Sequence, residues 1–245
     1  MRAYALIPAR SGSKGLPDKN ILSVAGHPLL AYSVAFGKAI PVERVLLSTD
    51  SPEYAEIGRS YGAECPALRG AEASGDTAME EDILADLDRS LPTLDIPLPD
   101  VWVWLKPTCP FRDPAAVTKA LEVLRDRPDI DSVRIVTEAD LRLHCVNSDG
   151  FLEPFSDKWD PKRSKMRRTE FPKVYHPFNL EVFRHEGWRQ RGSLFMGRRI
   201  YPVVLPRITG LDVDDRDGFE IIRTLIEATP RPDIVRRHIL LEPRL

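Results

Sequence analysis

The sequence predicts an α/β domain built on a doubly wound, mostly parallel sheet. Two short apolar runs, 3–7 and 45–48, have the length and character of buried strands, and each is followed by a loop and a helical pattern. Strand, helix, strand and helix in this order form the repeating unit of a parallel sheet. Ligands of such sheets bind beyond the carboxyl ends of the strands. At 245 residues, the whole chain 1–245 is expected to form a single domain.

Capping residues and hydrophobic periodicity predict the other elements. Asp50 or Ser51 can cap a helix that begins at Pro52, and Asp113 can cap one that begins at Pro114. The remaining elements expected are helices at 29–36, 79–87 and 219–228, strands at 101–105, 132–136 and 201–206, and a hairpin turn at 149–150.

Composition and charge exclude several classes of protein. A net charge of -2 gives no general attraction to nucleic acid or to an anionic membrane, so neither is expected as a partner. No apolar run approaches the roughly 20 residues of a membrane span, and the N-terminus does not resemble a secretory signal, which predicts a cytoplasmic protein. Cys65, Cys109 and Cys145 lack C-x-x-C spacing and are expected to be unbridged thiols in or near the core.

The first strand ends at Pro8 in a loop rich in glycine, serine and cations. Gly12 and Gly15 are predicted to adopt positive φ and to let the backbone approach a ligand closely. This composition is typical of phosphate binding, although it also fits a solvated turn. The spacing matches neither a P-loop nor a G-x-G-x-x-G motif. The cations of the loop are Arg10, Lys14 and Lys19.

A second candidate site lies near the C-terminus, where acids precede an amphipathic helix. Asp212 and Asp214 are two residues apart in an extended segment, so their carboxylates should point to one side. Carboxylate oxygens suit Mg²⁺ (or Mn²⁺), which takes few protein ligands and completes its shell with water and phosphate. Asp215 and Asp217 instead fit the acid-rich start of a helix.

Four segments resemble the motifs of the acylneuraminate cytidylyltransferases, also called CMP-sialic acid synthetases. Ile7–Ile21 resembles the opening motif of that family almost letter for letter, and its end differs from the loop of the related CMP-Kdo synthetases. The segment from Arg69 to Asp76 matches a second motif in part. Lys106–Arg112 is similar to Gln-Pro-Thr-Ser-Pro-Leu-Arg, and 212–217 to Ile-Asp-Ile-Asp-x-x-x-Asp. The resemblance implies a Rossmann-like nucleotidyltransferase fold of the GT-A type.

The resemblance also implies roles for individual residues. The implied nucleotide-binding residues are Ala9, Arg10, Lys14, Lys19, Asn20, Arg69 and Asp76. The implied catalytic residues are Arg10, Lys19, Asp212 and Asp214, of which the two aspartates bind the metal ion. The implied acceptor-binding residues are Lys106, Arg142, Arg168 and Phe178.

Segment 138–175 corresponds to the dimerisation arm of the family, which implies a homodimer. Its basic stretch 157–173 could be a solvated face or a nucleic-acid patch, but cations that gather an anionic sugar and a triphosphate fit the overall charge better. The acceptor side departs from the family at several positions: Lys106 replaces a glutamine, and Phe178, Asn179 and Val182 replace asparagine, glycine and tyrosine. A rebuilt sugar pocket is therefore expected.

The resemblance predicts an enzyme that transfers CMP from CTP to the anomeric hydroxyl of a 2-keto-3-deoxy sugar acid, a sialic-acid-like nonulosonate, and releases pyrophosphate. One alternative is a CMP-Kdo-like or other nucleotidyltransferase with a different anionic acceptor. Another is a non-catalytic nucleotide sensor, which the altered acceptor positions permit. CTP binding without turnover would favour the sensor, while retention of Arg10, Lys19, Asp212 and Asp214 favours the enzyme.

Overall fold

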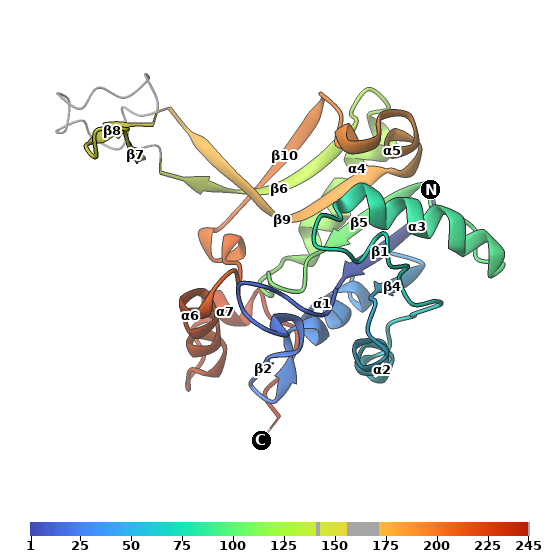
Figure 1. Cartoon of the computed structure of the whole chain (residues 1–245), viewed down its shortest axis with the longest axis horizontal. Coiled ribbons are helices and arrows are strands. Elements are labelled where there is room, and N and C mark those ends of the chain that lie inside the picture. The colour runs from blue at the N-terminus through green and yellow to red at the C-terminus, as the bar shows by residue number, and fades with distance from the viewer. Residues whose placement is uncertain (141–142, 156–171, 245) are drawn as a thin grey trace.

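The computed structural model describes residues 1–140, 143–155 and 172–244, except for the side chains of residues 178 and 179. A six-stranded sheet with the strand order β10-β6-β9-β5-β1-β4 forms its centre (Figure 1). Strand β9 is antiparallel to both neighbours, and the other pairs are parallel. The predicted mostly parallel sheet is confirmed. The strands are β1 (Ala3–Pro8), β4 (Arg44–Ser48), β5 (Val101–Leu105), β6 (Ser132–Ala139), β9 (Val174–Arg184) and β10 (Ile200–Leu205).

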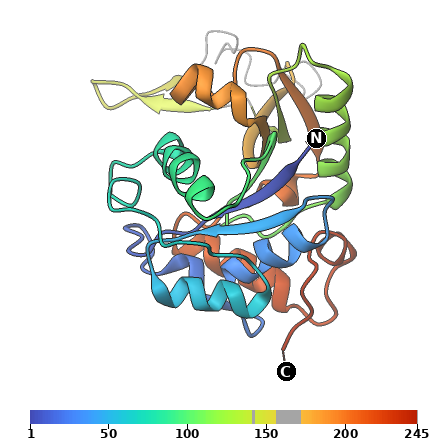
Figure 2. The same cartoon turned by 90° about the vertical axis from the view of Figure 1, so that its right-hand side faces the viewer.

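Helices cover both faces of the sheet because its strands are apolar on both sides. One core cluster packs α1 (Leu29–Lys38), α2 (Pro52–Tyr61) and α4 (Pro114–Asp126) against one face. A second packs α3 (Glu80–Thr93) and α5 (His185–Arg191) against the other. Figure 2 shows α3 on one side of the sheet and α1 and α2 on the opposite side. This is the doubly wound arrangement that the sequence predicts.

A third core cluster ties the C-terminal region to the loop after β1. Helices α6 (Arg216–Glu227) and α7 (Asp233–Arg236) pack on the small hairpin of β2 (Ser23–Val24) and β3 (His27–Pro28). Leu16 of the loop and Val213 of the acidic segment are buried in this cluster. Residues about 200 positions apart in the chain are thereby held side by side. Short 3₁₀ turns complete the fold at η1 (Lys19–Ile21), η4 (Gly192–Leu194) and η5 (Arg207–Gly210).

A two-stranded hairpin projects from the body of the molecule (Figure 1). It pairs β7 (His144–Val146) with β8 (Leu152–Pro154) in antiparallel register, and Gly150 in its turn has φ 84°. The turn predicted at 149–150 is confirmed. Cys145 lies on this hairpin, so the expectation that all three cysteines lie in or near the core is wrong for Cys145 and confirmed for the buried Cys65 and Cys109.

The predicted helix caps are largely confirmed. Ser51 caps α2 by accepting a hydrogen bond from the Tyr54 N–H, and Asp113 caps α4 by accepting one from Ala115 N–H. The helix expected at 79–87 begins at Glu80 and continues to Thr93. Within the described ranges, no helix combines the length and the apolar character needed to cross a membrane.

Candidate active site

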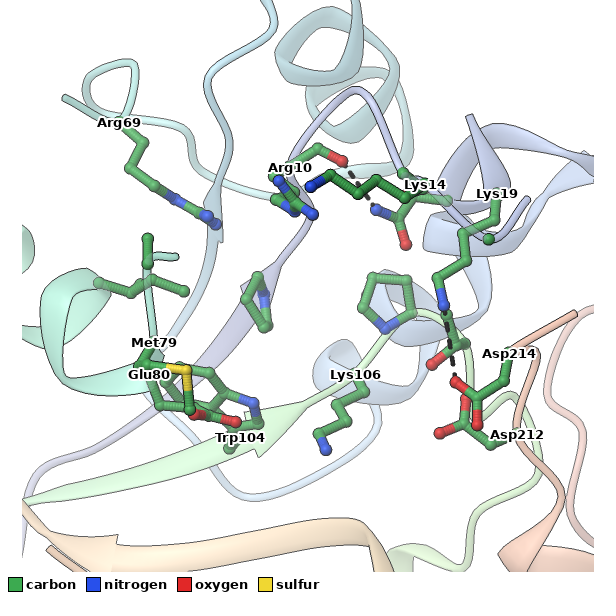
Figure 3. A pocket seen from close by; sticks show the side chains of 18 of the residues that line it. Arg10, Lys14, Lys19, Arg69, Met79, Glu80, Trp104, Lys106, Asp212 and Asp214 are labelled. Atoms are coloured by element: carbon green, nitrogen blue, oxygen red, sulfur yellow. Dashed lines mark hydrogen bonds and ion pairs between the residues drawn. The ribbon is translucent and has the colours of Figure 1, made fainter. Parts of the chain in front are cut away.

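A cavity of about 500 Å³ opens beyond the carboxyl ends of β1 and β5 (Figure 3). The two strands are parallel neighbours, so the loops that follow them meet at the same edge of the sheet. Five cationic and three acidic side chains line this first cavity, which therefore favours a polyanion. The charged residues are Arg10, Lys14, Lys19, Arg69, Lys106, Glu80, Asp212 and Asp214.

The loop after β1 turns through left-handed backbone at two places. Gly12 has φ 66° and Asp18 has φ 50°, and the Asp18 carboxylate accepts a hydrogen bond of 2.9 Å from the Tyr54 hydroxyl. The predicted positive φ at Gly15 is wrong. A Cβ atom at Gly15 would lie 3.0 Å from the backbone oxygen of Asp214, so glycine here permits close packing of the loop on the acidic segment.

Side-chain hydrogen bonds fix the start of this loop. Asp50 accepts hydrogen bonds from both the backbone N–H and the hydroxyl of Ser11, each 2.8 Å long. Burial alone would raise the pKa of Asp50, but these hydrogen bonds lower it below its usual value. Asn20 donates to the Arg10 carbonyl at 3.0 Å. The loop is therefore shaped before any ligand binds, which reduces the entropic cost of binding.

Arg10 and Lys14 share one carboxylate. Asp76 lies 3.1 Å from the Arg10 guanidinium and 2.8 Å from the Lys14 ammonium, which hold the pKa of this carboxyl below its usual value. Asp76 thus lies beside cations of the loop that follows β1 (residues 9–20, called the phosphate loop below), although it is not among the residues that line the first cavity. Ala9 also does not line the cavity: it is buried, and its N–H donates to the Ser48 carbonyl.

The two predicted metal ligands lie together on the far side of the same cavity. Figure 3 shows Asp212 and Asp214 side by side, with the Lys19 ammonium reaching toward them. Lys19 donates a 2.9 Å hydrogen bond to the Val213 carbonyl and lies 3.7 Å from Asp214 Oδ1. The sequence prediction that both carboxylates face one side agrees with this placement.

The Asp212 carboxylate fits a divalent cation. Its Oδ1 atom is buried and has no hydrogen-bond partner among the described residues. A buried carboxylate oxygen without a partner is costly, whereas a divalent cation would satisfy it. Mg²⁺ binds through one or two carboxylates and completes its shell with water and phosphate oxygens, and the pair Asp212 and Asp214 fits this requirement. Asp215 caps α6 by accepting from the Gly218 N–H, and Asp217 is exposed outside the cavity.

Arg69 is buried, lines the cavity and hydrogen-bonds to neighbouring segments of the chain. Its guanidinium donates to the hydroxyl and the carbonyl of Ser48 at the end of β4 and lies 3.5 Å from the Ala73 carbonyl. Burial lowers the pKa of Arg69 to about 10. These contacts hold the loop that carries Asp76 against the sheet, so Arg69 positions the cavity wall as well as lining it.

Arg112 supports the loop after β5 from below. It is fully buried, and it donates to the Lys106 carbonyl and, at 3.1 Å, to the Ser33 hydroxyl. Burial lowers the pKa of Arg112 to about 10, while the nearby charge of Asp212 opposes this shift. The sequence motif contains Arg112, but no sequence signal indicated that its side chain points inward and positions Lys106.

A second cavity of about 390 Å³ adjoins the first. The two cavities share Glu80, from the start of α3, and Lys106. Arg134 and Glu181 form an ion pair of 2.7 Å in the second cavity, which sequence reasoning missed because the two residues come from different strands. Lys106 therefore lies at the junction of the two cavities. Among the other predicted acceptor residues, Arg142 and Arg168 lie outside the described residues, as does the side chain of Phe178.

The phosphate loop, whose conformation is fixed by hydrogen bonds, faces a pair of carboxylates across a cavity. The cavity lies at the carboxyl edge of an α/β sheet, and this arrangement is typical of a nucleotidyltransferase site. A family profile described as cytidylyltransferase matches residues 4–191. N-acylneuraminate cytidylyltransferase of Escherichia coli is 30% identical over 237 residues, which are 95% of this chain and 54% of that protein. The chain belongs to the cytidylyltransferase family.

Other relatives agree in class but differ in acceptor. Pseudaminic acid cytidylyltransferase of Campylobacter jejuni is 27% identical over 92% of this chain and 96% of its own length. CMP-N,N'-diacetyllegionaminic acid synthase of Legionella pneumophila is 39% identical over 50% of this chain and 53% of its own length. The chain spans about half the length of the Escherichia coli relative, whereas the match to the Legionella relative covers about half of each protein.

Solved structures share the fold. CMP:2-keto-3-deoxy-manno-octonic acid synthetase complexed with CTP has a TM-score of 0.69 at 19% identity and covers 92% of this chain and 98% of its own. The 4-diphosphocytidyl-2C-methyl-D-erythritol synthase of Anaerococcus prevotii has a TM-score of 0.63 at 12% identity, with coverages of 93% and 99%. At these identities the likeness concerns the fold alone, and it confirms the Rossmann-like nucleotidyltransferase fold.

Proposed function

We propose that this protein transfers CMP from CTP to the anomeric hydroxyl of a 2-keto-3-deoxy nonulosonate and releases pyrophosphate. The observation that carries the proposal is the unpartnered Oδ1 of Asp212, which lies in the same cavity as the cations of the phosphate loop. The names of the relatives support CTP and an acidic nine-carbon sugar as the substrates.

In this reaction the sugar hydroxyl oxygen attacks the α-phosphorus in line with the bond to the departing pyrophosphate. The new oxygen–phosphorus bond forms, the bond to the bridging oxygen breaks, and the hydroxyl proton is lost to solvent. Arg10, Lys14 and Lys19 hold the phosphate oxygens, on which negative charge builds during transfer. Because hydrogen bonds hold this loop in place, the three cations are already positioned to stabilise that charge when the substrate binds.

Asp212 and Asp214 would hold Mg²⁺ or Mn²⁺, which supplies neutralisation of the phosphate charge when bound. Asn20 and Arg69 maintain the loops on either side of the nucleotide through their hydrogen bonds to backbone carbonyls. Lys106, at the junction of the two cavities, provides a cation for the carboxylate of the sugar acid.

We infer a homodimer in which Arg142 and Arg168 of the arm contact the acceptor in the partner subunit. Exposed apolar side chains on the hairpin support an interface: Phe151, Leu152 and Phe155 are each more than 70% exposed. A cytoplasmic location is part of the same proposal, since the three unbridged thiols fit a reducing compartment.

The test is pyrophosphate release from CTP with Mg²⁺ in the presence of sialic, legionaminic, pseudaminic, deaminated and eight-carbon ulosonic acids. We expect release with at least one nine-carbon acid, loss of release in Asp212→Ala, and normal release in Asp217→Asn, whose carboxylate lies outside the cavity. CTP binding without release on any acid would overturn the proposal in favour of a nucleotide sensor. Release with eight-carbon acids alone would assign the chain a CMP-Kdo-like activity.

A further inference from the structure

The three cations of the phosphate loop have different partners in the protein. Lys19 contacts the segment of the acid pair. Arg10 and Lys14 instead contact the two oxygens of a single carboxylate: Asp76 Oδ1 lies 3.1 Å from Arg10, and Asp76 Oδ2 lies 2.8 Å from Lys14. Figure 3 shows the ends of the Arg10 and Lys14 side chains next to each other. One carboxylate therefore occupies two of the cations that the proposed function assigns to the phosphates.

The backbone that carries Asp76 is fixed on both sides of this residue. Before it, the buried Arg69 guanidinium lies 3.5 Å from the Ala73 carbonyl. Around it, the Ala78 N–H donates to the Gly75 carbonyl at 3.1 Å and closes a turn. The carboxylate therefore stays close to the two cations even when it does not contact them. A group tethered in this way competes with a free ligand at a high effective concentration.

The Asp76 side chain, in contrast to its backbone, is free to exchange partners. It is 54% exposed and lies outside the lining of the first cavity, and the Lys14 side chain is 72% exposed. Ion pairs between exposed groups are weak, because water and dissolved salt screen them. A polyphosphate carries several negative charges and offers charged oxygens to both cations at once. It can therefore replace the carboxylate, which in turn can replace a polyphosphate that has lost part of its contacts.

We propose that Asp76 competes with the phosphates for Arg10 and Lys14 and thereby promotes the departure of pyrophosphate. When CTP binds, its phosphate oxygens displace the carboxylate from the two cations. After the bond to the bridging oxygen has broken, the carboxylate pairs with the cations again, and pyrophosphate leaves. The inference rests on the proposed function. It assigns Asp76 an effect opposite to that of a nucleotide-binding residue, because its charge weakens the binding of the ligand.

The test measures the Kd of inorganic pyrophosphate in the presence of Mg²⁺ by isothermal titration calorimetry, without CTP or a sugar acid. Asp76→Asn keeps the size of the side chain and removes its charge. We expect this variant to bind pyrophosphate about 3- to 10-fold more tightly than the unmodified protein, and the difference should shrink as the salt concentration rises. During turnover, followed as formation of the CMP-sugar, added pyrophosphate should inhibit the variant at a correspondingly lower concentration.

Two further variants serve as controls. Glu72→Gln removes the same charge from the same loop, but Glu72 is 90% exposed and pairs with Arg89 at 3.8 Å, away from the phosphate loop. It should leave the Kd of pyrophosphate unchanged. Asp76→Glu keeps the charge, so its Kd should lie closer to that of the unmodified protein than the Kd of Asp76→Asn does.

Other outcomes overturn the inference in distinguishable ways. Weaker binding of pyrophosphate by Asp76→Asn would show that the carboxylate orients the cations for the ligand, and equal binding would show that it does not compete. An equal gain in Glu72→Gln would attribute the effect to net charge. Because the calorimetric experiment needs no sugar acid, absence of turnover with every acid would remove the proposed function and the role in product departure, while the Kd still decides the competition. Absence of pyrophosphate binding to either protein would remove the competition itself.

Discussion

Replacing Asp212 with asparagine should separate stability from activity. The Asp212 Oδ1 atom is buried without a hydrogen-bond partner among the described residues, and an unsatisfied buried polar group costs about 1–3 kcal/mol. Asparagine removes the charge at nearly constant volume, and an unpartnered amide oxygen costs less to bury than an unpartnered carboxylate oxygen. Part of the gain is offset because the charge of Asp212 also favours the charged form of the buried Arg112. We therefore expect a net gain of about 1 kcal/mol in the free energy of unfolding.

For a chain of this length, about 1 kcal/mol corresponds to a rise of about 2–4 °C in Tm. The rate of pyrophosphate release should fall about 10²-fold or more, because the variant loses a ligand for the cation that neutralises the phosphates. The affinity for CTP and Mg²⁺ should fall together with the activity. Saturating CTP and Mg²⁺ at about 100 times Kd stabilises the unmodified protein by about 2.7 kcal/mol, and the Asp212→Asn variant should lose most of this response.

Thermal unfolding without ligand, thermal unfolding with CTP and Mg²⁺, and turnover of the same preparations measure the three quantities. Asp214→Asn is the comparison variant: its side chain is 82% exposed, so it should leave the ligand-free Tm unchanged while it also lowers turnover. A ligand-free Tm that falls by more than about 5 °C in Asp212→Asn would show that the carboxylate is a structural partner. Turnover within tenfold of the unmodified protein would contradict its role as a metal ligand.

Three further substitutions test the supports of the site. Arg112→Leu removes a charged donor from both the Lys106 carbonyl and the Ser33 hydroxyl, so the free energy of unfolding should fall by about 1–3 kcal/mol and the KM for the sugar acid should rise, as denaturant titration and acceptor kinetics would show. Asp50→Asn weakens the hydrogen bonds from Ser11, and a tenfold higher KM for CTP with little change in kcat is expected, which steady-state kinetics can contradict. Burial lowers the pKa of His185. The stability that the neutral imidazole contributes is therefore complete above about pH 6.5 and is lost as the pH falls through the lowered pKa. If the free energy of unfolding of His185→Gln falls with decreasing pH below about 6.5 as steeply as that of the unmodified protein, this reasoning is wrong.

Most of the charged residues that line the first cavity could be predicted from the sequence because they lie in short segments. The loop from Arg10 to Asn20 and the pair Asp212 and Asp214 each lie within one short segment, and strand ends in a parallel sheet bring such segments together. Backbone detail was less accessible. The sequence suggested positive φ at Gly15, whereas Asp18 adopts it, because the tertiary hydrogen bond to its carboxylate cannot be read from local propensity.

Buried polar groups were the main omission. Arg69 appeared in the sequence as a nucleotide contact, but its guanidinium is largely occupied by carbonyl and hydroxyl groups of the protein. Arg112 belonged to a motif but received no role from the sequence, although it is fully buried beneath the loop of Lys106. A sequence pattern can indicate that an arginine is present at a site, but it does not state whether the side chain points toward the ligand or back into the fold.

The acceptor side was the least predictable part because it is assembled across strands. Strand β9 runs antiparallel between β5 and β6, and this insertion alone places Glu181 beside both Trp104 and Arg134. The row they form crosses from the first cavity, which Trp104 lines, to the second, which Glu181 and Arg134 line. Its members come from three separate segments of the chain, so no local motif records their contact. Motifs within single segments can therefore identify the loop after β1 and the acid pair, while the part of the site that is assembled across strands becomes apparent only from the sheet topology.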